Sequence, residues 1–386
     1  MIVVIADDIS GAAEIAAVGK RSGLMAQVQT RFDPTASVHL VAVDTDTRSG
    51  TRQEAQERIT ALADRLRSAD IDWCFKKVDS VLRGHVCVEL AALMNGLGKR
   101  QTILAPANPS MGRTIMHGQY LIDNQPLDQT DFAHDPEYPA KSCRIADLLS
   151  GPVYVAAVPD NDLPRDGIVV GQAESREHLE HWALQVHDEV LPAGGADFFR
   201  VLLKATPNLR WLANDQTPVM SNETAFFICG SGSETSRQAV TRAKTSGVLV
   251  CPMPDALYNQ SLSDNGTLIR QWAEDIMAAL AQGDRVVAAI VQPVVFDARL
   301  ALHVRTQTAV MVQHVLGKIE IRELLIEGGA TGRAILDRMG WQRLNVIGEY
   351  GPGIVKMQVL GHQNQIVTLK PGSYPWPEEL LGGNKT

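Results

Sequence analysis

Short apolar runs alternate with helical stretches along this chain of 386 residues. In its first part, the runs cover residues 2–6, 38–43, 73–78 and 102–105, and residues 10–22 carry apolar side chains at helical spacing. Such alternation is typical of parallel strands joined by crossover helices. The sequence therefore predicts an α/β fold with largely parallel sheets.

The alternation is interrupted once and then resumes. Residues 206–223 are rich in Pro, Asn and Thr, as linkers often are. Because a domain usually holds roughly 150 residues, a chain of this length predicts two domains. We expect an N-terminal α/β domain over residues 1–210 and a C-terminal α/β domain over residues 221–386, with their sheets facing each other across a cleft.

The sequence also predicts particular structures for two segments of the first domain and for the strands of the second. Between residues 106 and 139, prolines and glycines are frequent, which predicts an ordered loop or a small hairpin over one edge of the first sheet. Residues 176–190 carry Leu179, Trp182 and Val186 on one face, which predicts a helix. In the second domain the expected strands are residues 225–229, 248–251, 285–291, 323–327, 344–347, 355–360 and 366–369.

Composition excludes several classes of partner. The chain is 45% hydrophobic and 21% charged, as in soluble globular proteins. Its formal net charge of -8 disfavours nucleic acid and anionic membrane surfaces as partners. The five cysteines lack CxxC spacing, and the apolar N-terminal run is too short for a signal peptide or membrane span. We therefore expect a cytoplasmic protein with free thiols.

Polar side chains follow several of the predicted N-terminal strands. Asp7 and Asp8 follow the first run, residues 44–48 (DTDTR) follow the second, and Asp79 and Ser80 follow the third. Ligands of open parallel sheets bind beyond the carboxyl ends of the strands. We therefore expect these polar ends to meet at one edge of the sheet.

Each of these polar groups has two interpretations. The paired aspartates could hold a substrate hydroxyl, take its proton or hold magnesium, or one of them could cap the following helix. Position favours a functional role for Asp8 more than for Asp7. The guanidinium of Arg83 could clamp a carboxylate in bidentate fashion, or it could form a local ion pair with Asp79.

In the second half, three apolar runs end at glycines. A strand that brings glycine amides to a helix N-terminus forms an anion site, because unpaired N–H groups and the helix dipole point the same way. Hydroxyls beside these glycines could bond a phosphate oxygen or cap a helix. The glycine-rich stretches are residues 230–233 (GSGS), 328–331 (GGAT) and 371–373 (PGS).

Several common site patterns are missing from the sequence. It has neither a GxxxxGK[ST] loop nor a GxGxxG fingerprint, so a standard P-loop or Rossmann site is not predicted. Histidines 178, 181 and 187 lack a Cys or carboxylate partner at diagnostic spacing, and we predict no metal site formed by them. No Ser-His-Asp or GxSxG pattern supports a hydrolase.

Five motifs together resemble the four-carbon acid sugar kinase family, in order and over nearly the whole chain. The Lys-Val-Asp-Ser-x-x-Arg-Gly stretch is the most specific of them. The motifs are residues 6–12 (ADDISGA), 44–48 (DTDTR), 76–84 (KKVDSVLRG), 106–114 (PANPSMGRT) and 327–331 (EGGAT).

The resemblance implies an ATP-dependent kinase that uses Mg²⁺ and phosphorylates the terminal hydroxyl of threonate, erythronate or an oxo-tetronate. Its N-terminal domain would hold the acid sugar and its C-terminal domain ATP. The matching acid-sugar positions are Asp8, Arg48, Asp79, Ser80 and Arg83, with Asp8 and Asp79 as catalytic candidates. The matching nucleotide positions are Ser231 or Ser233, Gly328, Gly329, Ala330, Thr331 and Gly372.

On this hypothesis, Arg48 and Arg83 pair with the substrate carboxylate, while Asp8 or Asp79 deprotonates the hydroxyl. The chain departs from the family at Ile9-Ser10, where Leu-Thr is commoner, and at residues 370–376 (KPGSYPW), which puts the Gly372 contact in question. Two alternatives are a nucleotide-dependent oxidoreductase or isomerase of small hydroxy acids, and a non-catalytic sugar-acid-binding protein. The sequence leaves open which acid is used, which aspartate is the base, and whether the chain forms a homodimer.

Overall fold

The chain forms two compact units, Met1–Asn214 and Asp215–Thr386. The computed structural model describes residues 1–135, 138–157, 163–206, 224–230, 233–259, 265–292, 297–362, 364–372 and 374–381. None of the helices in these ranges is long and apolar enough to cross a membrane.

Unit 1 contains a parallel sheet with the strand order β2-β3-β1-β4-β11-β5-β10-β9. Its central strands are buried on both faces, which explains their continuous apolar sequences. The strands are β1 (Ile2–Ala6), β2 (Ala26–Gln29), β3 (Leu40–Asp44), β4 (Trp73–Lys77), β5 (Gln101–Ala105), β9 (Tyr154–Ala156), β10 (Gly167–Gly171) and β11 (Val190–Gly194).

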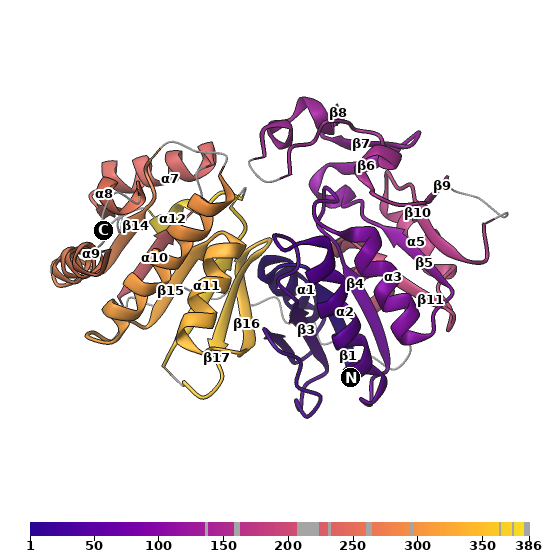
Figure 1. Ribbon diagram of the computed structural model, residues 1–386, viewed down its shortest axis with the longest axis horizontal. Coiled ribbons are helices and arrows are strands. Elements are labelled where there is room, and N and C mark those ends of the chain that lie inside the picture. The colour runs from indigo at the N-terminus through magenta and orange to yellow at the C-terminus, as the bar shows by residue number, and fades with distance from the viewer. Residues whose placement is uncertain are drawn as a thin grey trace. The chain divides into compact units, whose positions relative to one another are not determined.

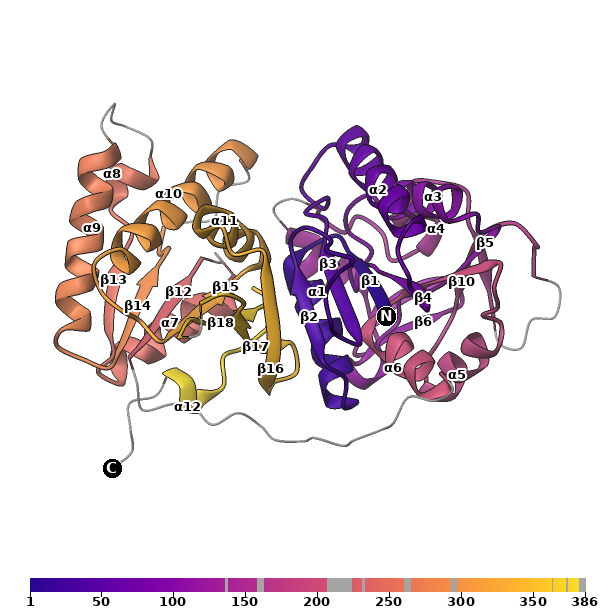
Figure 2. The ribbon, with the colours of Figure 1, turned by 90° about the horizontal axis from the view of Figure 1, so that it is seen from below.

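Helices cover both faces of this sheet. Figure 2 shows α2 and α3 on one face and α5 and α6 on the other, and α1 packs against α6. Caps set where two of them begin: Asp8 accepts a hydrogen bond from Gly11 N at α1, and Thr51 forms a capping box with Glu54 at α2. The helices are α1 (Ile9–Arg21), α2 (Arg52–Arg67), α3 (Val86–Leu97), α4 (Ile145–Leu148), α5 (Arg176–Leu184) and α6 (Ala196–Ala205).

A small antiparallel sheet lies over the carboxyl edge of the unit 1 sheet (Figure 1). It confirms the hairpin predicted for the Pro- and Gly-rich segment. Its strands are β6 (Arg113–Met116), β7 (Gln119–Ile122) and β8 (Gln125–Pro126), flanked by the 3-10 helices η1 (Pro109–Met111), η2 (Leu127–Gln129) and η3 (Asp131–His134). Ile115 N donates to Ala173 O at 2.9 Å, which ties this small sheet, called the hairpin sheet below, to the segment after β10.

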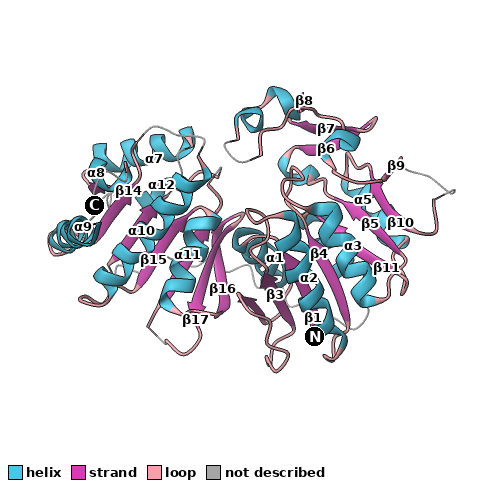
Figure 3. Cartoon of the chain, viewed as in Figure 1, coloured by secondary structure: helices cyan, strands magenta, loops and turns pink. Residues whose placement is uncertain are grey.

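Unit 2 has a mixed sheet with the order β13-β14-β12-β15-β18-β17-β16, in which β17 runs antiparallel to both of its neighbours, β16 and β18. Figure 3 shows helices alternating with the parallel strands. The strands are β12 (Ala225–Cys229), β13 (Leu249–Pro252), β14 (Arg285–Ala289), β15 (Glu323–Glu327), β16 (Arg343–Gly351), β17 (Ile354–Val359) and β18 (Ile366–Lys370). The helices are α7 (Glu234–Thr245), α8 (Asp255–Tyr258), α9 (Asn265–Leu280), α10 (Ala298–Leu316), α11 (Gly329–Met339) and α12 (Glu378–Leu381).

The core of unit 2 includes side chains that follow its last strand in sequence. Phe227 of β12 packs edge-on against Trp376, with ring centroids 5.6 Å apart. Both side chains belong to one buried cluster that also holds Ala243 of α7 and Leu380 of α12. The segment after β18 is therefore anchored to the sheet by aromatic packing.

Two features of unit 1 differ from the sequence predictions. The helix predicted over residues 176–190 ends at Leu184, and Val190 begins β11. Strand β11 (VLPAG) escaped prediction because Pro and Gly are rare in central strands. Strand β2 (AQVQ) was missed because its glutamines, although buried, are polar in sequence.

Candidate functional site

The carboxyl ends of three neighbouring strands bring the predicted acidic residues together. In the parallel register, Ala6 of β1 lies opposite Asp44 of β3 and Lys77 of β4. Asp7 and Asp8 leave β1 at this level, between the turns that follow β3 and β4. Chain connections run to both sides of β1, which is the arrangement that places ligand sites in open sheets.

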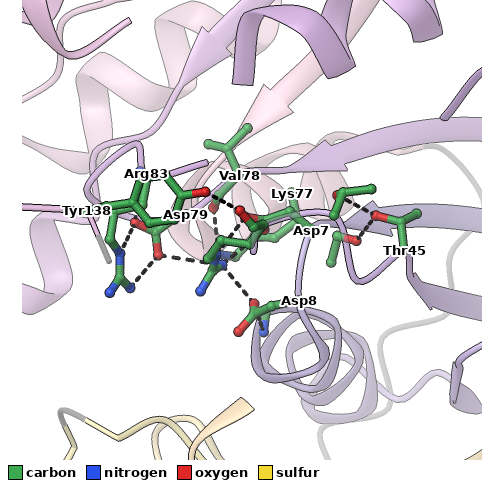
Figure 4. A network of polar contacts seen from close by, with 12 residues as sticks. Asp7, Asp8, Thr45, Lys77, Val78, Asp79, Arg83 and Tyr138 are labelled. Atoms are coloured by element: carbon green, nitrogen blue, oxygen red, sulfur yellow. Dashed lines mark hydrogen bonds and ion pairs between the residues drawn. The ribbon is translucent and has the colours of Figure 1, made fainter. Parts of the chain in front are cut away.

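Arg48, from the turn after β3, links three carboxylates. Figure 4 shows these carboxylates, Asp7, Asp8 and Asp79, within one network of polar contacts. Its Nε donates to Asp7 Oδ2 at 2.7 Å, and its Nη2 donates to Asp7 Oδ1 at 3.0 Å and to Asp8 Oδ1 at 2.8 Å. Nη2 also lies 3.5 Å from Asp79 Oδ1. One guanidinium thus gathers the acidic groups of β1 and β4 into one cluster.

Asp79 and Arg83 form the local ion pair that the sequence left open. Arg83 Nε and Nη2 donate to the two Asp79 carboxylate oxygens at 2.9 and 2.8 Å, and Nη1 donates to Asp135 Oδ2 at 2.8 Å. Asp79 Oδ2 also accepts from the backbone N–H of Val81 and Arg83. The Arg83 fork is therefore occupied by protein carboxylates on all three nitrogens.

The carboxylates of the cluster differ in their tendency to ionise. Burial raises the pKa of Asp7, but the positive charges of Arg48 and Lys76 together outweigh it and leave the pKa below its usual value. Asp79 is buried too, and Arg83 and Arg48 hold its pKa well below the usual range. For Asp8, burial and the neighbouring charge of Asp7 exceed the effect of Arg48, so its pKa is raised. Asp8 is thus the strongest proton acceptor of the three.

Ser80 connects the cluster to the hairpin sheet. Its hydroxyl accepts a hydrogen bond from Arg113 Nη1, and its carbonyl accepts one from the Tyr120 hydroxyl. Tyr138, beyond the hairpin sheet, donates to the carbonyl of Arg48. Sequence reasoning did not assign Arg113, Asp135 or Tyr138 to the site, because these contacts join segments that are far apart in the chain.

Two buried lysines of β4 lie on opposite faces of the sheet beneath the cluster. Lys76 Nζ lies 2.7 Å from Glu89 Oε2 of α3, and both side chains are 1% exposed. Lys77 Nζ lies 3.3 Å from Glu14 Oε2 of α1 and donates to Val78 O at 2.8 Å. Each lysine is paired, so the sheet beneath the acidic cluster carries no net charge from these groups.

In unit 2, neighbouring strands bring the predicted glycines together. Cys229 of β12 and Lys370 of β18 both lie opposite Glu327 of β15. A Cβ on Gly230 would lie 2.5 Å from Thr331 Oγ1, so only glycine allows this approach. Ser233 caps α7 through Ser236 N, and its hydroxyl donates to Gly372 O at 3.0 Å. Ser231 lies outside the described residues.

The N-terminus of α11 presents unpaired amides. Gly328 has φ 94° and ψ 125°, a conformation that favours glycine, and no side chain caps the helix. Its own N–H donates to Lys370 O at 2.8 Å. Within the described residues, the N–H groups of Gly329, Ala330 and Thr331 donate no hydrogen bond. The turn therefore offers three donors and a helix dipole to an anion such as a phosphate.

A buried ion pair supports this turn. Lys370 Nζ lies 3.1 Å from Glu327 Oε2, with both side chains fully buried, and Trp376 Nε1 donates to the same oxygen at 3.0 Å. Lys370 also donates to the carbonyls of Pro371 and Tyr374. Lys370 and Trp376, from the segment in which the chain departs from the family, thus both contact the Glu327 side chain at the end of β15.

Comparison with known proteins follows the same division into two units. Residues 2–190 match the family model of a sugar-binding N-terminal domain, and residues 226–374 match that of a nucleotide-binding C-terminal domain. A crystal structure of a Salmonella typhimurium LT2 protein has a TM-score of 0.78 at 20% sequence identity, covering 98% of this chain and 97% of that one. This likeness shows that the fold is shared.

Curated relatives include sugar-acid kinases. A D-threonate kinase of Salmonella typhimurium is 30% identical over 173 residues, which span 43% of this chain and 40% of the relative. A D-threonate kinase of Cupriavidus necator is 27% identical over 380 residues, or 91% of this chain and 88% of the relative. Because the two family models together cover most of the sequence and its motifs match in order, the chain belongs to the four-carbon acid sugar kinase family.

Proposed function

We propose that this protein is an ATP-dependent kinase that phosphorylates the terminal hydroxyl of a four-carbon sugar acid of the threonate, erythronate or oxo-tetronate type. The observation that carries the proposal is the pairing of two sites in one chain. Unit 1 carries a cluster of carboxylates and guanidinium groups, and unit 2 carries a glycine turn with unpaired amides. A polyol acid suits the first site and a triphosphate suits the second.

In unit 1, Asp8 acts as the general base and Asp79 orients the substrate. Asp8 is 18% exposed, whereas Asp7 and Asp79 are each 5% exposed. A carboxylate that is both accessible and of raised pKa is suited to take the proton of the attacking hydroxyl. Arg48 Nη1 donates no hydrogen bond to any described residue, so it remains available to the substrate, as does the Ser80 hydroxyl.

In unit 2, the amides of Gly329, Ala330 and Thr331 bind phosphate oxygens, with Ser233 and Gly372 completing the wall of the site. The unpaired amides fit a nucleotide triphosphate. Among the described residues, no group of three or more His, Cys, Asp and Glu side chains could hold a metal ion. We propose that Mg²⁺ is held mainly by the phosphate oxygens of the nucleotide and by water. The ion would neutralise the phosphates during transfer.

The proposal predicts that replacing Gly328 with Ala raises the KM for ATP. An alanine strains the positive φ by roughly 1–3 kcal/mol and shifts the amides, so we expect a KM about 10-fold higher, with the KM for the sugar acid unchanged. Gly340→Ala is the matched control, because Gly340 has φ 70° at the other end of the same helix. It should lower stability while leaving the KM for ATP as it is. An equal rise in both variants would remove the Gly328 turn from the nucleotide site.

A coupled assay of ADP release over a panel of C4 and C5 aldonates and 3-oxo-tetronates tests the activity itself. We expect release with at least one four-carbon acid and little with the five-carbon acids. Tight NAD(P) binding without ADP release would instead indicate the oxidoreductase or isomerase alternative. Sugar-acid binding by calorimetry without ATP binding would indicate a non-catalytic binding protein.

A further inference from the structure

Arg113 stands out among the guanidinium groups of the site because, within the described part of the chain, no carboxylate pairs with it. It begins β6 in the hairpin sheet and is 8% exposed. Its Nη1 donates to the Ser80 hydroxyl, and its guanidinium lies 5.8 Å from the centre of the Phe132 ring. Among the described residues, it forms no ion pair and no other side-chain hydrogen bond. Burial of an arginine without a negatively charged partner costs stability, and a bound anion would supply that partner.

The other two arginines of the site are already neutralised. Arg48 contacts Asp7, Asp8 and Asp79, and Arg83 contacts Asp79 and Asp135. A carboxylate arriving at Arg83 would have to displace Asp79 or Asp135 from hydrogen bonds of 2.8–2.9 Å. At Arg113 an anion would have to displace no carboxylate of the described residues.

The position of Arg113 within the network also suits a carboxylate. Arg83 and Arg113 both lie against the Phe132 ring, at 5.6 and 5.8 Å from its centre. From there the contacts run through Asp79 to Arg48 and end at Asp8. Arg113 and Asp8 thus lie at opposite ends of this chain of contacts, as the carboxylate and the terminal hydroxyl do in a sugar acid.

We infer that Arg113, and not Arg83, binds the carboxylate of the acid substrate and gives the enzyme its preference for acids over neutral polyols. The Ser80 hydroxyl, held by Arg113, then faces the same end of the substrate. This inference rests on the proposed function for the substrate class, but the binding it describes requires no phosphoryl transfer. Arg83 is left with a positioning role, holding Asp79 and Asp135 in place.

The experiment compares ligand binding by calorimetry in the wild type and in Arg113→Gln. The ligands are D-threonate, D-erythronate and 3-oxo-tetronates, with threitol and erythritol as neutral counterparts. We expect the wild type to prefer an acid over its alditol. In Arg113→Gln, the acid should bind roughly 10- to 150-fold more weakly, the range for losing a charge-assisted hydrogen-bond pair, and the preference should fall by the same factor. Arg113→Lys keeps the positive charge but loses the two-pronged guanidinium, so its affinity for the acid should lie between those of the wild type and Arg113→Gln.

Arg144→Gln is the matched control, since Arg144 is an exposed arginine that pairs through its backbone with Gln119 of the hairpin sheet. Its acid preference should equal that of the wild type. The inference is overturned if Arg113→Gln keeps the acid preference, if acid and alditol weaken equally, or if no acid binds the wild type. Acid binding that depends on Arg113 without ADP release would sustain the inference and remove the kinase proposal. ADP release by the wild type, together with unchanged acid binding in Arg113→Gln, would overturn the inference and support the kinase proposal.

Discussion

Replacing Asp8 with Asn should lower kcat by about 100- to 10,000-fold, the usual contribution of a general base. The amide keeps the shape of the carboxylate and remains a good helix cap for α1, so the fold should be retained. Because the amide cannot accept the hydroxyl proton, the loss should fall on kcat while the sugar acid and ATP still bind. Steady-state kinetics with calorimetric binding measures both.

Asp46→Asn provides the matched control for this substitution. Asp46 lies on the turn after β3, its side chain is 45% exposed, and its charge partner is Arg58 outside the cluster. Its φ of 50° is one that asparagine accepts readily. This variant should keep the wild-type kcat. If Asp8→Asn retains more than a tenth of the wild-type kcat, the proton goes elsewhere and Asp79 becomes the candidate base.

Replacing Arg48 with Met should cost about 3–5 kcal/mol of stability, because it strands the buried carboxylate of Asp7. Asp7 is 5% exposed, and Arg48 supplies both of its side-chain hydrogen bonds from within the described residues. Urea unfolding of the variant measures the loss. The double variant Asp7→Asn with Arg48→Met should recover part of it, since neither charge then remains buried alone.

Arg58→Met tests whether the loss of stability expected for Arg48→Met comes from the burial of its ion pair. Arg58 and Asp46 also form an ion pair, at 3.5 Å, but their side chains are 47% and 45% exposed. An exposed pair contributes below about 1 kcal/mol, so this variant should unfold close to the wild type. Equal losses in the Arg48 and Arg58 variants would mean that the acidic cluster is not the buried, arginine-dependent unit described above.

The sequence predicted the sheets well because their strands are buried on both faces. Continuous apolar runs such as Ile2–Ala6 and Ala225–Cys229 appear as strands with the expected bounds. Where polar residues or a proline interrupt a buried strand, as in Ala26–Gln29 and Val190–Gly194, the apolar signal is lost. Tertiary pairing, and not local propensity, forms those strands.

In the candidate site, the residues at strand ends were predictable, whereas the contacts between distant segments were not. The aspartates of β1 and β4 were predictable because carboxyl ends of parallel strands converge, and Gly328 because it follows a strand and opens a helix. The Asp79 partner of Arg83 was one of two predicted interpretations, because the two residues are close in sequence, whereas Asp135 was not predicted, because it comes from a distant segment. Arg113 lies in one of the motifs of the sequence, but its proposed role could not be read there, because it depends on how the described carboxylates are distributed over the three arginines.

The central claim is that the γ-phosphate of ATP moves to the primary hydroxyl of a four-carbon acid bound beside Asp8. Phosphorus NMR of the product mixture tests it most directly, using the acid that gives the highest ADP release. We expect a new phosphate monoester signal that is split into a triplet by the two protons of a terminal CH₂, forms in proportion to ADP and is lost in Asp8→Asn. Inorganic phosphate alone, or a doublet from a secondary ester, would contradict it.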